Sequence, residues 1–384
     1  MDGLGCKYLL FLRDPLYNFD ANLFQHNNSL SLHAIYNYKL AKLVPLDKAV
    51  PFSDLAAKSG LSEVNVRRFL RHAMTNRIFY EPSPGFVAHT AASRVLATDQ
   101  AMDDWVGFCV DDMWPAASQT IPALQQHPEA DDMKQTGFCK ANGTTDIKPL
   151  FATLNEDKSR ITRFSGAMKS LMTGEGYELS YLINNYDWAT LNSQSAKIVD
   201  LGGSHGDVSI ALARHYPNLT FIVQDLPNAI ASAKPIPTDL ANRITLRTHD
   251  FTKPQPVKGA DLYLFRWIMH NHSDKYATTI LRALIPALKK GARILVNDYC
   301  LPEPGQLLDG GEERVLRTMD LVMLTLLNAQ ERSEVEFRSL FEGVDSRFRF
   351  LGVKRVDGYR MSFLETMWEG EDFGGEGGEV KAKL

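Results

Sequence analysis

Hydrophobic and polar positions alternate between two periods over residues 190–369. Short apolar runs of strand length occur at KIVDLGG, TFIVQDLP, RITLRTHDF, ADLYLFRWI and ARILVNDYCL. Segments with apolar residues at helical spacing lie between them, for example VSIALARHY and YATTILRALIPALKK. Strands that alternate with helices predict an α/β domain, in which a mostly parallel sheet carries helices on both faces. Ligands of such domains bind at the carboxyl ends of the strands.

The N-terminal region, residues 1–97, has a different pattern. Residues 52–60 (FSDLAAKSG) have the spacing of a short amphipathic helix that ends at a glycine, and residues 64–76 that of a second helix. The second helix places four apolar residues on one face, namely Val66, Phe69, Leu70 and Ala73. Two strand-like pieces, IFYEP and GFVAHT, follow and are joined by Ser83-Pro84-Gly85. Helix, turn, helix and hairpin together predict a winged-helix module.

Three arginines on the second helix, Arg67, Arg68 and Arg71, leave two interpretations of this module open. They could contact DNA, in which case the protein would be a regulator that senses a ligand. Alternatively, they form a solvated face of a module that packs against a partner subunit. The formal net charge of −4 and the absence of a basic arm favour the partner subunit and argue against nucleic acid. The same charge argues against a general affinity for anionic membranes.

Residues 98–189 are expected to form irregular helices with many large apolar side chains. Taken singly, each of these side chains could simply belong to a hydrophobic core. Together, beside a catalytic domain, they could line a pocket for a flat hydrophobic ligand. They are Trp105, Phe108, Met113, Trp114, Phe164, Met168 and Met172.

Cysteines and apolar runs indicate the compartment. Cys6, Cys109, Cys139 and Cys300 are too scattered for a zinc knuckle, a redox dithiol or a disulfide framework, so reduced thiols in a cytoplasmic protein are expected. No small-residue cleavage site follows the run YLLFL, so no signal peptide is expected. No apolar stretch approaches the ~20 residues of a membrane-spanning helix. Residues 370–384, rich in glycine and charge, are expected to be disordered.

A glycine-rich turn follows the first strand of the α/β domain. Its sequence is Asp200-Leu-Gly202-Gly203-Ser204-His205-Gly206. Glycines let the backbone turn sharply and come close to a ligand, but NAD enzymes use a similar turn. Asp200 distinguishes the two cases, because its charge would be badly placed beside a pyrophosphate. It suits the cationic amino-acid part of S-adenosylmethionine.

Further acidic residues end the next two strands. Asp225 lies ~20 residues downstream, where a carboxylate can accept both ribose hydroxyls, and Leu226 beside it is also expected to contact the cofactor. A helix cap is the alternative role for Asp225, because Pro227 opens the next helix. Asp250 and Phe251 suit the amino group and the flat face of adenine. The ribose acid alone fits either nucleotide, but acids at three successive strand ends favour the methyl donor.

His270 follows the fourth strand, in the sequence RWIMHNHSD. A lone histidine is more often structural than catalytic, but two carboxylates accompany this one. Asp298 ends the fifth strand, and Glu331 follows an apolar helix over residues 316–327. Two carboxylates beside an imidazole would fix its tautomer and stabilise the imidazolium, so His270 is expected to be a general base. No histidine and carboxylate cluster has the spacing of a dedicated metal site, and no metal is expected.

These ordered motifs resemble the small-molecule O-methyltransferases of plants and fungi. This is the group of caffeic acid O-methyltransferase and of fungal polyketide O-methyltransferases such as the sterigmatocystin enzyme. The resemblance covers residues 30–368. It implies a Rossmann-like, S-adenosylmethionine-dependent methyltransferase domain over residues 190–369, preceded by an α-helical and winged-helix dimerisation domain over residues 1–97. It also implies that the protein is a homodimer.

The resemblance assigns roles to single residues. The family's glycine-rich turn matches Gly202–Gly206, and its ribose-binding acid matches Asp225. Its adenine-site pair matches Asp250-Phe251, and its basic residue beside the cofactor matches Arg266. The catalytic base matches His270, with Asp298 and Glu331 implied as its supports. Two substrate-lining helices match the positions of Phe164 and Met168, and of Met319, Asp320 and Met323.

The chain departs from the family pattern at several positions. Ser204 replaces the middle glycine of the turn, and His272 stands where a tryptophan is usual. Asp298 stands where the plant enzymes carry the longer Glu, which puts its reach to His270 in question. The segment before residue 30 is short, so part of the dimer arm is expected to be missing. An apolar series still favours a dimer, namely Leu30, Leu32, Ala34, Ile35 and Leu40.

The implied reaction transfers a methyl group from a sulfonium to a phenolic oxygen. General-base help is worth roughly 10²–10⁴-fold in such a step. The aromatic and methionine-rich walls suggest a flat, hydrophobic phenol, such as a polyketide-type intermediate of secondary metabolism. The alternative enzyme class keeps the fold and the bound cofactor but steers pericyclic or dehydration reactions of natural products. Retention of His270 with both acids favours methyl transfer.

Overall fold

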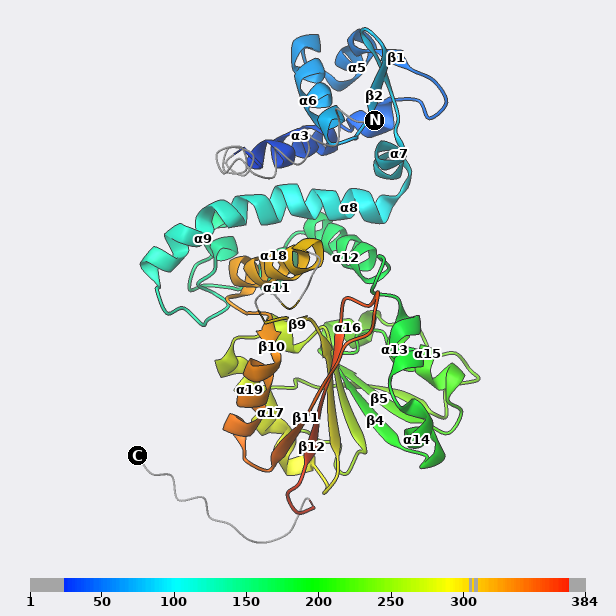
Figure 1. Cartoon of the computed structure of the whole chain (residues 1–384), viewed down its shortest axis with the longest axis vertical. Coiled ribbons are helices and arrows are strands. Elements are labelled where there is room, and N and C mark those ends of the chain that lie inside the picture. The colour runs from blue at the N-terminus through cyan, green and yellow to red at the C-terminus, as the bar shows by residue number, and fades with distance from the viewer. Residues whose placement is uncertain (1–23, 304–305, 307–309, 373–384) are drawn as a thin grey trace, which may run out of the picture. The chain divides into compact units, whose positions relative to one another are not determined.

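The computed structural model describes residues 24–303, 306 and 310–372. The chain divides into two compact units (Figure 1). The first extends to Ser118 and includes Phe151–Leu171, and the second comprises Gln119–Leu150 and the chain from Met172 onward. The domain boundaries at residues 97 and 189 stay predictions, because the helices of the middle region are divided between the units. The YLLFL run, Cys6 and residues 373–384 lie outside the described residues.

The helix, turn, helix and hairpin predicted near the N-terminus are present in the first unit. Its elements here are α3 (His26–Asn37), α4 (Leu40–Leu43), β1 (Val50–Pro51), α5 (Phe52–Ser59), α6 (Glu63–Thr75), β2 (Tyr80–Ser83) and β3 (Phe86–Ala88). β3 lies between β1 and β2 in an antiparallel sheet. α5 ends at Gly60, whose φ of 77° is the left-handed conformation that glycine adopts without strain. Three of the four apolar residues expected on α6 are buried, while Phe69 is half-buried.

Polar contacts occupy two of the three arginines on α6. Arg71 donates through Nε and Nη2 to the two carboxylate oxygens of Glu81, both at 2.9 Å. Arg67 lies 3.8 Å from Glu63 on the same helix. The apolar series near the N-terminus serves the unit's own core, since Ala34, Ile35 and Leu40 are buried there. That series therefore gives less support to a dimer than the sequence suggested.

Further helices follow in the first unit. They are α7 (Ala91–Thr98), α8 (Gln100–Phe108), the π-helical turn η1 (Cys109–Met113), α9 (Trp114–Gln126), α11 (Leu150–Asn155) and α12 (Lys158–Met172). The chain passes into the second unit within α9. Ion pairs fasten α12 to η1: buried Asp112 pairs with Arg160 at 2.5 Å and with Arg163 at 2.8 Å, and Asp111 pairs with Arg163 at 2.6 Å. Two arginines around one buried carboxylate supply the bonds that its burial requires.

The second unit contains a seven-stranded sheet in the order β11-β12-β8-β7-β4-β5-β6. Its strands are β4 (Lys197–Leu201), β5 (Thr220–Asp225), β6 (Ile244–Thr248), β7 (Leu262–Arg266), β8 (Arg293–Asp298), β11 (Phe348–Lys354) and β12 (Ser362–Trp368). The five strands β4 to β8 are parallel to one another, which confirms the α/β prediction. β12 is antiparallel to both β8 and β11, and neither β11 nor β12 was predicted.

Helices lie on both sides of this sheet. Figure 1 places α17 (Asp274–Leu284) and α19 (Glu334–Val344) on one side, and α13 (Leu179–Asn185), α14 (Trp188–Ser193) and α15 (Asp207–His215) on the other. The remaining elements are α10 (Gly137–Ala141), α16 (Pro227–Ser232), the 3-10 helices η2 (Met269–Asn271) and η3 (Ile285–Ala287), α18 (Gly310–Leu327), β9 (Cys300–Leu301) and β10 (Arg332–Ser333). The helix predicted over residues 276–290 ends early, because Pro286 lacks the N–H that would continue it.

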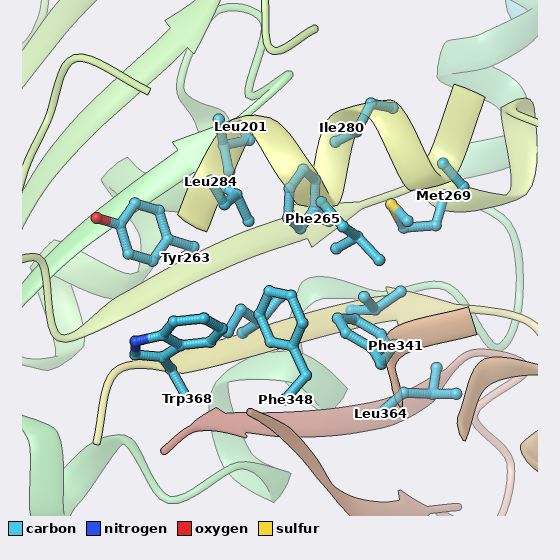
Figure 2. Close-up of a cluster of buried hydrophobic side chains, with 14 of the residues drawn as sticks. Leu201, Tyr263, Phe265, Met269, Ile280, Leu284, Phe341, Phe348, Leu364 and Trp368 are labelled. Carbon is cyan, nitrogen blue, oxygen red and sulfur yellow. The ribbon is translucent and has the colours of Figure 1, made fainter. Parts of the chain in front are cut away.

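The largest hydrophobic core packs α17 and α19 against the sheet. Figure 2 shows part of it, with Tyr263 and Phe265 of β7, Ile280 and Leu284 of α17, and Phe341 of α19. Met269, the first residue of η2, is fully buried in the same cluster. The residue after Met269 is His270, so this core anchors the turn that carries the predicted base. No described helix is long and apolar enough to cross a membrane.

Candidate functional site

The glycine-rich turn after β4 fits closely against its neighbours. Gly202 has a φ of 71°, and a side chain at this position would collide with Ile268. A Cβ added to Gly203 would lie 2.6 Å from Cγ of Asp200. Ser204 takes the left-handed conformation with a φ of 51°, which is unusual for a residue with a side chain. The backbone of this turn is therefore held in a narrow range of conformations, and at Gly202 and Gly203 it presents only main chain.

Asp200 lies beneath the turn rather than on its surface. It is fully buried, and the Ser209 hydroxyl donates to its Oδ2 at 2.7 Å. Burial raises the pKa of Asp200 to about 6, although the Ser209 hydrogen bond and the charge of Arg266 oppose the shift. Its expected place near the cationic part of the cofactor stays a prediction.

Asp225 organises the backbone at the end of β5. Its Oδ2 accepts a hydrogen bond from Ser204 N at 2.8 Å, and its Oδ1 accepts one from Leu226 N at 2.7 Å. It does not cap α16, which begins at Pro227 without a side-chain cap. Each carboxylate oxygen keeps a lone pair for another donor. Leu226 is 54% exposed, an apolar side chain left open beside the acid.

The end of β6 places a second acid and an aromatic ring near the turn. Asp250 Oδ1 accepts from Thr252 N at 2.9 Å and from its hydroxyl at 2.7 Å. Burial acts to raise the pKa of Asp250, but these hydrogen bonds outweigh it and the pKa is lowered. The Phe251 ring packs edge-on against His272, with centroids 5.6 Å apart. The histidine that replaces the usual tryptophan thus still packs beside the predicted adenine site.

Arg266, at the end of β7, is buried and bound mainly by the protein. Its Nη1 donates to Asn297 Oδ1 and, at 2.6 Å, to the Tyr359 hydroxyl, while Nη2 donates to the carbonyl of Tyr177 at 3.2 Å. Its Nε has no partner in the described chain. Arg266 was predicted only to lie beside the cofactor. In the structure it also connects β7 to β8 and to the loop before β12.

His270 lies in η2, with its imidazole buried against Glu331. His270 Nδ1 is 2.9 Å from Glu331 Oε1, and no hydrogen bond to Nε2 occurs among the described residues. Asp298 Oδ2 instead accepts the backbone N–H of His270 at 3.2 Å. Glu331 and Asp298 were both expected to flank the imidazole. In the structure Glu331 contacts the ring, whereas Asp298 binds the main chain of His270. The shorter side chain of Asp298 is sufficient for that second role.

Charges around His270 control its protonation. Burial acts to lower the pKa of His270, but Glu331 and Asp298 outweigh it and the pKa is raised. Burial raises the pKa of Asp298 to about 6, with His270 opposing that shift and Glu331 adding to it. The two carboxylates therefore favour the protonated imidazole of His270, which is the effect that the predicted base would need.

Buried polar atoms without a hydrogen-bond partner gather in this part of the second unit. They include Arg266 Nε, Trp267 Nε1, His272 Nδ1, Asp298 Oδ1 and Glu331 Oε2. An unpaired buried polar atom costs roughly 1–3 kcal/mol, and such atoms usually find partners in folded proteins. Their concentration around η2 indicates that this region binds water or a ligand. Within the described residues, no group of three or more metal-ligating side chains occurs.

The predicted substrate-lining residues lie in both compact units. In the second, Met319, Asp320 and Met323 share α18, and Asp320 Oδ1 accepts the backbone N–H of Glu331 at 2.9 Å. In the first, Phe164 packs edge-on against Phe108 and Phe151, with centroids 5.2 and 5.8 Å away. Met168 is half-buried on the same helix, and Met172, which ends that helix and is the first residue of the second unit's longer stretch, is 43% exposed. Their contact with a substrate stays a prediction.

Sequence reasoning missed several residues around His270. Trp267 packs its ring 5.1 Å from the imidazole and 5.2 Å from the ring of Tyr299. The hydroxyl of Tyr299 is hydrogen-bonded to that of Tyr177. Arg332, next to Glu331, bonds two carbonyls beside His270. Trp267 and Tyr299 directly follow strand ends, which was the available signal, whereas Tyr177 lies far away in the sequence.

Known proteins resemble this chain in sequence and in fold. Residues 126–345 match the O-methyltransferase domain family. Over 361 residues the chain is 49% identical to the chlorophenol O-methyltransferase of Trichoderma longibrachiatum, covering 93% of this chain and 77% of that protein.

Two solved structures share the fold. OxaC, in complex with SAH and oxaline, has a TM-score of 0.78 at 22% identity, covering 95% of this chain and 90% of its own. A pericyclic reaction enzyme has a TM-score of 0.73 at 21% identity, covering 95% and 92%. The domain match and the sequence relative confirm the resemblance inferred from the motifs. The chain belongs to the O-methyltransferase family.

Proposed function

We propose that this O-methyltransferase methylates a phenolic hydroxyl of a hydrophobic small molecule, with His270 as the general base and S-adenosylmethionine as the methyl donor. The pairing of one buried imidazole with one carboxylate carries the proposal. Because Glu331 Oε1 lies 2.9 Å from His270 Nδ1, the proton of a neutral imidazole resides on Nδ1. Nε2 is then free to accept a proton.

The chemistry balances with these groups. S-adenosylmethionine supplies an electrophilic methyl group on its sulfonium. The acceptor oxygen forms a bond to the methyl carbon as the carbon–sulfur bond breaks, and the hydroxyl proton passes to His270 Nε2. A phenol has a pKa of ~10 and a histidine of ~6.5, so the proton leaves as the oxygen attacks rather than before. Glu331 stabilises the imidazolium that results.

We infer that the strand ends of β4, β5 and β6 hold the cofactor. Asp225 is the expected partner of the ribose hydroxyls, because two backbone N–H groups already orient its carboxylate. Asp250 is the expected partner of the adenine amino group. Leu226, exposed beside Asp225, offers the apolar surface that a flat ring would cover, and Phe251 offers another. Gly202 and Gly203 would face the cofactor with main chain alone, and Ser204 would add a short hydroxyl side chain.

A phenol is the favoured acceptor. The name of the chlorophenol O-methyltransferase states that this relative, 49% identical, acts on a phenol. Met319 and Met323 lie on α18, the helix that also carries the Asp320 contact to Glu331, and supply apolar surface of adaptable shape. A polyketide-type intermediate of secondary metabolism is the expected natural substrate. We expect a homodimer in the cytoplasm, where Cys109, Cys139 and Cys300 would remain free thiols, as they are here.

Replacement of the base tests this function. His270→Ala should lower kcat by roughly 10²–10⁴-fold, the usual contribution of a general base. The affinity for S-adenosylmethionine should stay near that of the wild type, because its expected contacts lie on other residues. Transfer of labelled methyl from S-adenosylmethionine to a panel of phenols measures the first, and calorimetry measures the second.

His215→Ala is the matched control, since this histidine is exposed on α15 and should leave both quantities unchanged. Full activity of His270→Ala would refute the role of the base. If the wild type methylates no phenol or polyketide but rearranges one, the pericyclic alternative holds.

A further inference from the structure

Arg332 is a charged side chain with no exposed surface. It follows Glu331 directly and is the first residue of β10. Arginine is rarely buried in this way without partners, because removing a guanidinium from water costs several kcal/mol. The hydrogen bonds of Arg332 must offset this desolvation cost, so the groups that they bind indicate the role of the side chain.

Three donors of Arg332 bind groups around the turn that carries His270. Nη1 donates to the carbonyl of Met269 at 3.0 Å, and Nη2 donates to the carbonyl of His272 at 2.7 Å. Nε donates to Asp274 Oδ1 at 2.9 Å, at the start of α17. The two carbonyls belong to the residue before His270 and to the second residue after it. One planar guanidinium thus grips the main chain on both sides of the base.

The turn needs such a clamp because it is short. η2 has three residues, Met269–Asn271, and ends at His272 in an extended conformation. A 3-10 turn of this length has few internal hydrogen bonds and poor bond geometry. The side chain of Met269 is anchored in the core, and its carbonyl accepts both the His272 N–H, at 3.2 Å, and Arg332, while the His272 carbonyl accepts from Arg332.

The backbone of Arg332 is fixed to the strand that follows Asp298. β10 pairs in parallel with β9, and Arg332 lies opposite Cys300. Glu331, one residue earlier, holds the imidazole through Nδ1. Two consecutive residues therefore act on the base: Glu331 holds the ring of His270, and Arg332 holds the main chain on either side of it.

We propose that Arg332 is a positioning residue for the base, which clamps η2 through the carbonyls of Met269 and His272 so that the His270 ring stays on Glu331. The inference rests on the proposed role of His270. Misplacement of a reacting group by about 1 Å can cost 10²-fold in rate, so a clamp on this turn should act on kcat.

Charge gives this role a signature that a merely structural residue would lack. The groups that act on His270 are Glu331 and Asp298, which favour the imidazolium, and Arg332, which opposes it. His272, whose own pKa is lowered to about 4, mainly by burial, also lies near. Without the Arg332 cation, the pKa of His270 should rise. Because the base acts unprotonated, the acid limb of the kcat profile should then move to higher pH.

Two variants separate the clamp from the charge. Arg332→Met removes both, so kcat should fall about 10–100-fold and the acid limb should move to higher pH. Arg332→Lys keeps the cation but cannot fork to two carbonyls, so kcat should fall less and the limb should stay near its wild-type position. Arg338→Met is the control, since this arginine is exposed on α19 and its removal should keep the wild-type kcat. KM and the S-adenosylmethionine affinity should change less than twofold in all three.

A wild-type kcat or an unmoved acid limb in folded Arg332→Met would overturn the proposal, as would a parallel loss of cofactor affinity. If Arg332→Met does not fold, Arg332→Lys decides, and a wild-type kcat there overturns the clamp. His270→Ala belongs in the same assay. If it stays active, the proposed function fails; if it is inactive while Arg332→Met is not, only the clamp fails.

Discussion

Asp225 joins two stretches of backbone through the two oxygens of one carboxylate. Asp225→Ala should weaken the binding of S-adenosylmethionine by about 1.5–3 kcal/mol, the typical contribution of a hydrogen bond to a charged group. The loss has two sources, since the ribose partner disappears and Ser204 N loses its acceptor. Isothermal titration calorimetry measures the affinity.

Asp225→Asn is the matched comparison, because it keeps the shape and one acceptor oxygen and should lose less affinity than Asp225→Ala. Equal affinities of the wild type and both variants would remove Asp225 from the cofactor site. The control is Asp207→Ala, at the first position of α15, which should bind the cofactor like the wild type.

Some residue roles could be predicted from the chain and others could not. The position of His270 after a strand, with Glu331 after an apolar helix, is a local pattern, and these two residues do pair. The bond from the His270 backbone to Asp298 depends on a side-chain length and a distance that no pattern encodes. Nothing in the sequence indicated a role for Arg332, which simply follows Glu331 in the chain. Its burial follows from the pairing of β9 with β10, two strands of two residues each.

At the level of the element, α18 reaches the base through Asp320. The hydrogen bond from Glu331 N to Asp320 Oδ1 connects the helix to the residue that holds the imidazole. Asp320→Ala should therefore lower kcat by about fivefold, which corresponds to the ~1 kcal/mol of one net hydrogen bond, with KM unchanged. Steady-state kinetics on the phenol that the wild type methylates measure both.

Comparing the change in kcat with the change in KM distinguishes a positioning role of Asp320 from direct contact with the substrate. If Asp320 touches the substrate, as its place on a substrate-lining helix suggested, KM should rise in Asp320→Ala. Asp320→Asn keeps the acceptor oxygen and should restore most of kcat. Thr318→Ala, exposed on the same helix, should behave like the wild type.

Elements differ in how far the sequence predicts them. β4, β7 and β8 are buried strands with near-continuous apolar runs, which a local pattern identifies, whereas β6 has one buried position in five and was found from its place in the strand–helix alternation. β11 has only two buried positions in seven, as an edge strand can. β12 lies between β8 and β11 although it follows both in the chain, and this insertion depends on the tertiary fold. The five predicted strands were therefore found, while the antiparallel edge was not.

At the level of the whole molecule, apolar side chains remain exposed on the winged-helix module. Tyr80 and Phe86 of the hairpin are 49% and 41% exposed, and Leu30 of α3 and Tyr38, directly after that helix, are both 42% exposed. Contiguous exposed apolar surface is typical of subunit contacts. Light scattering at micromolar concentration should give the mass of two chains.

A charge on this surface tests where the contact lies. Tyr80→Glu combined with Phe86→Glu should shift the protein to monomers, because the charges would have to be buried in the contact. Val335→Glu is the control, since Val335 is 61% exposed on α19 in the other unit and should leave the mass unchanged. A monomeric wild type would contradict the dimer.

The antiparallel position of β12 affects how the protein is made. Ser362 of β12 pairs with Asp298 of β8, and the Ser362 carbonyl accepts from the Asn297 side chain at 3.0 Å. A ribosome makes the chain in order, so β8 emerges long before β12, its neighbour on one side; β7, its neighbour on the other side, is made earlier. Until β12 is made, one side of the strand that ends at Asp298 has unpaired amide and carbonyl groups, which is a template for aggregation. Nascent or truncated chains that stop before residue 362 should therefore need a chaperone and have no activity.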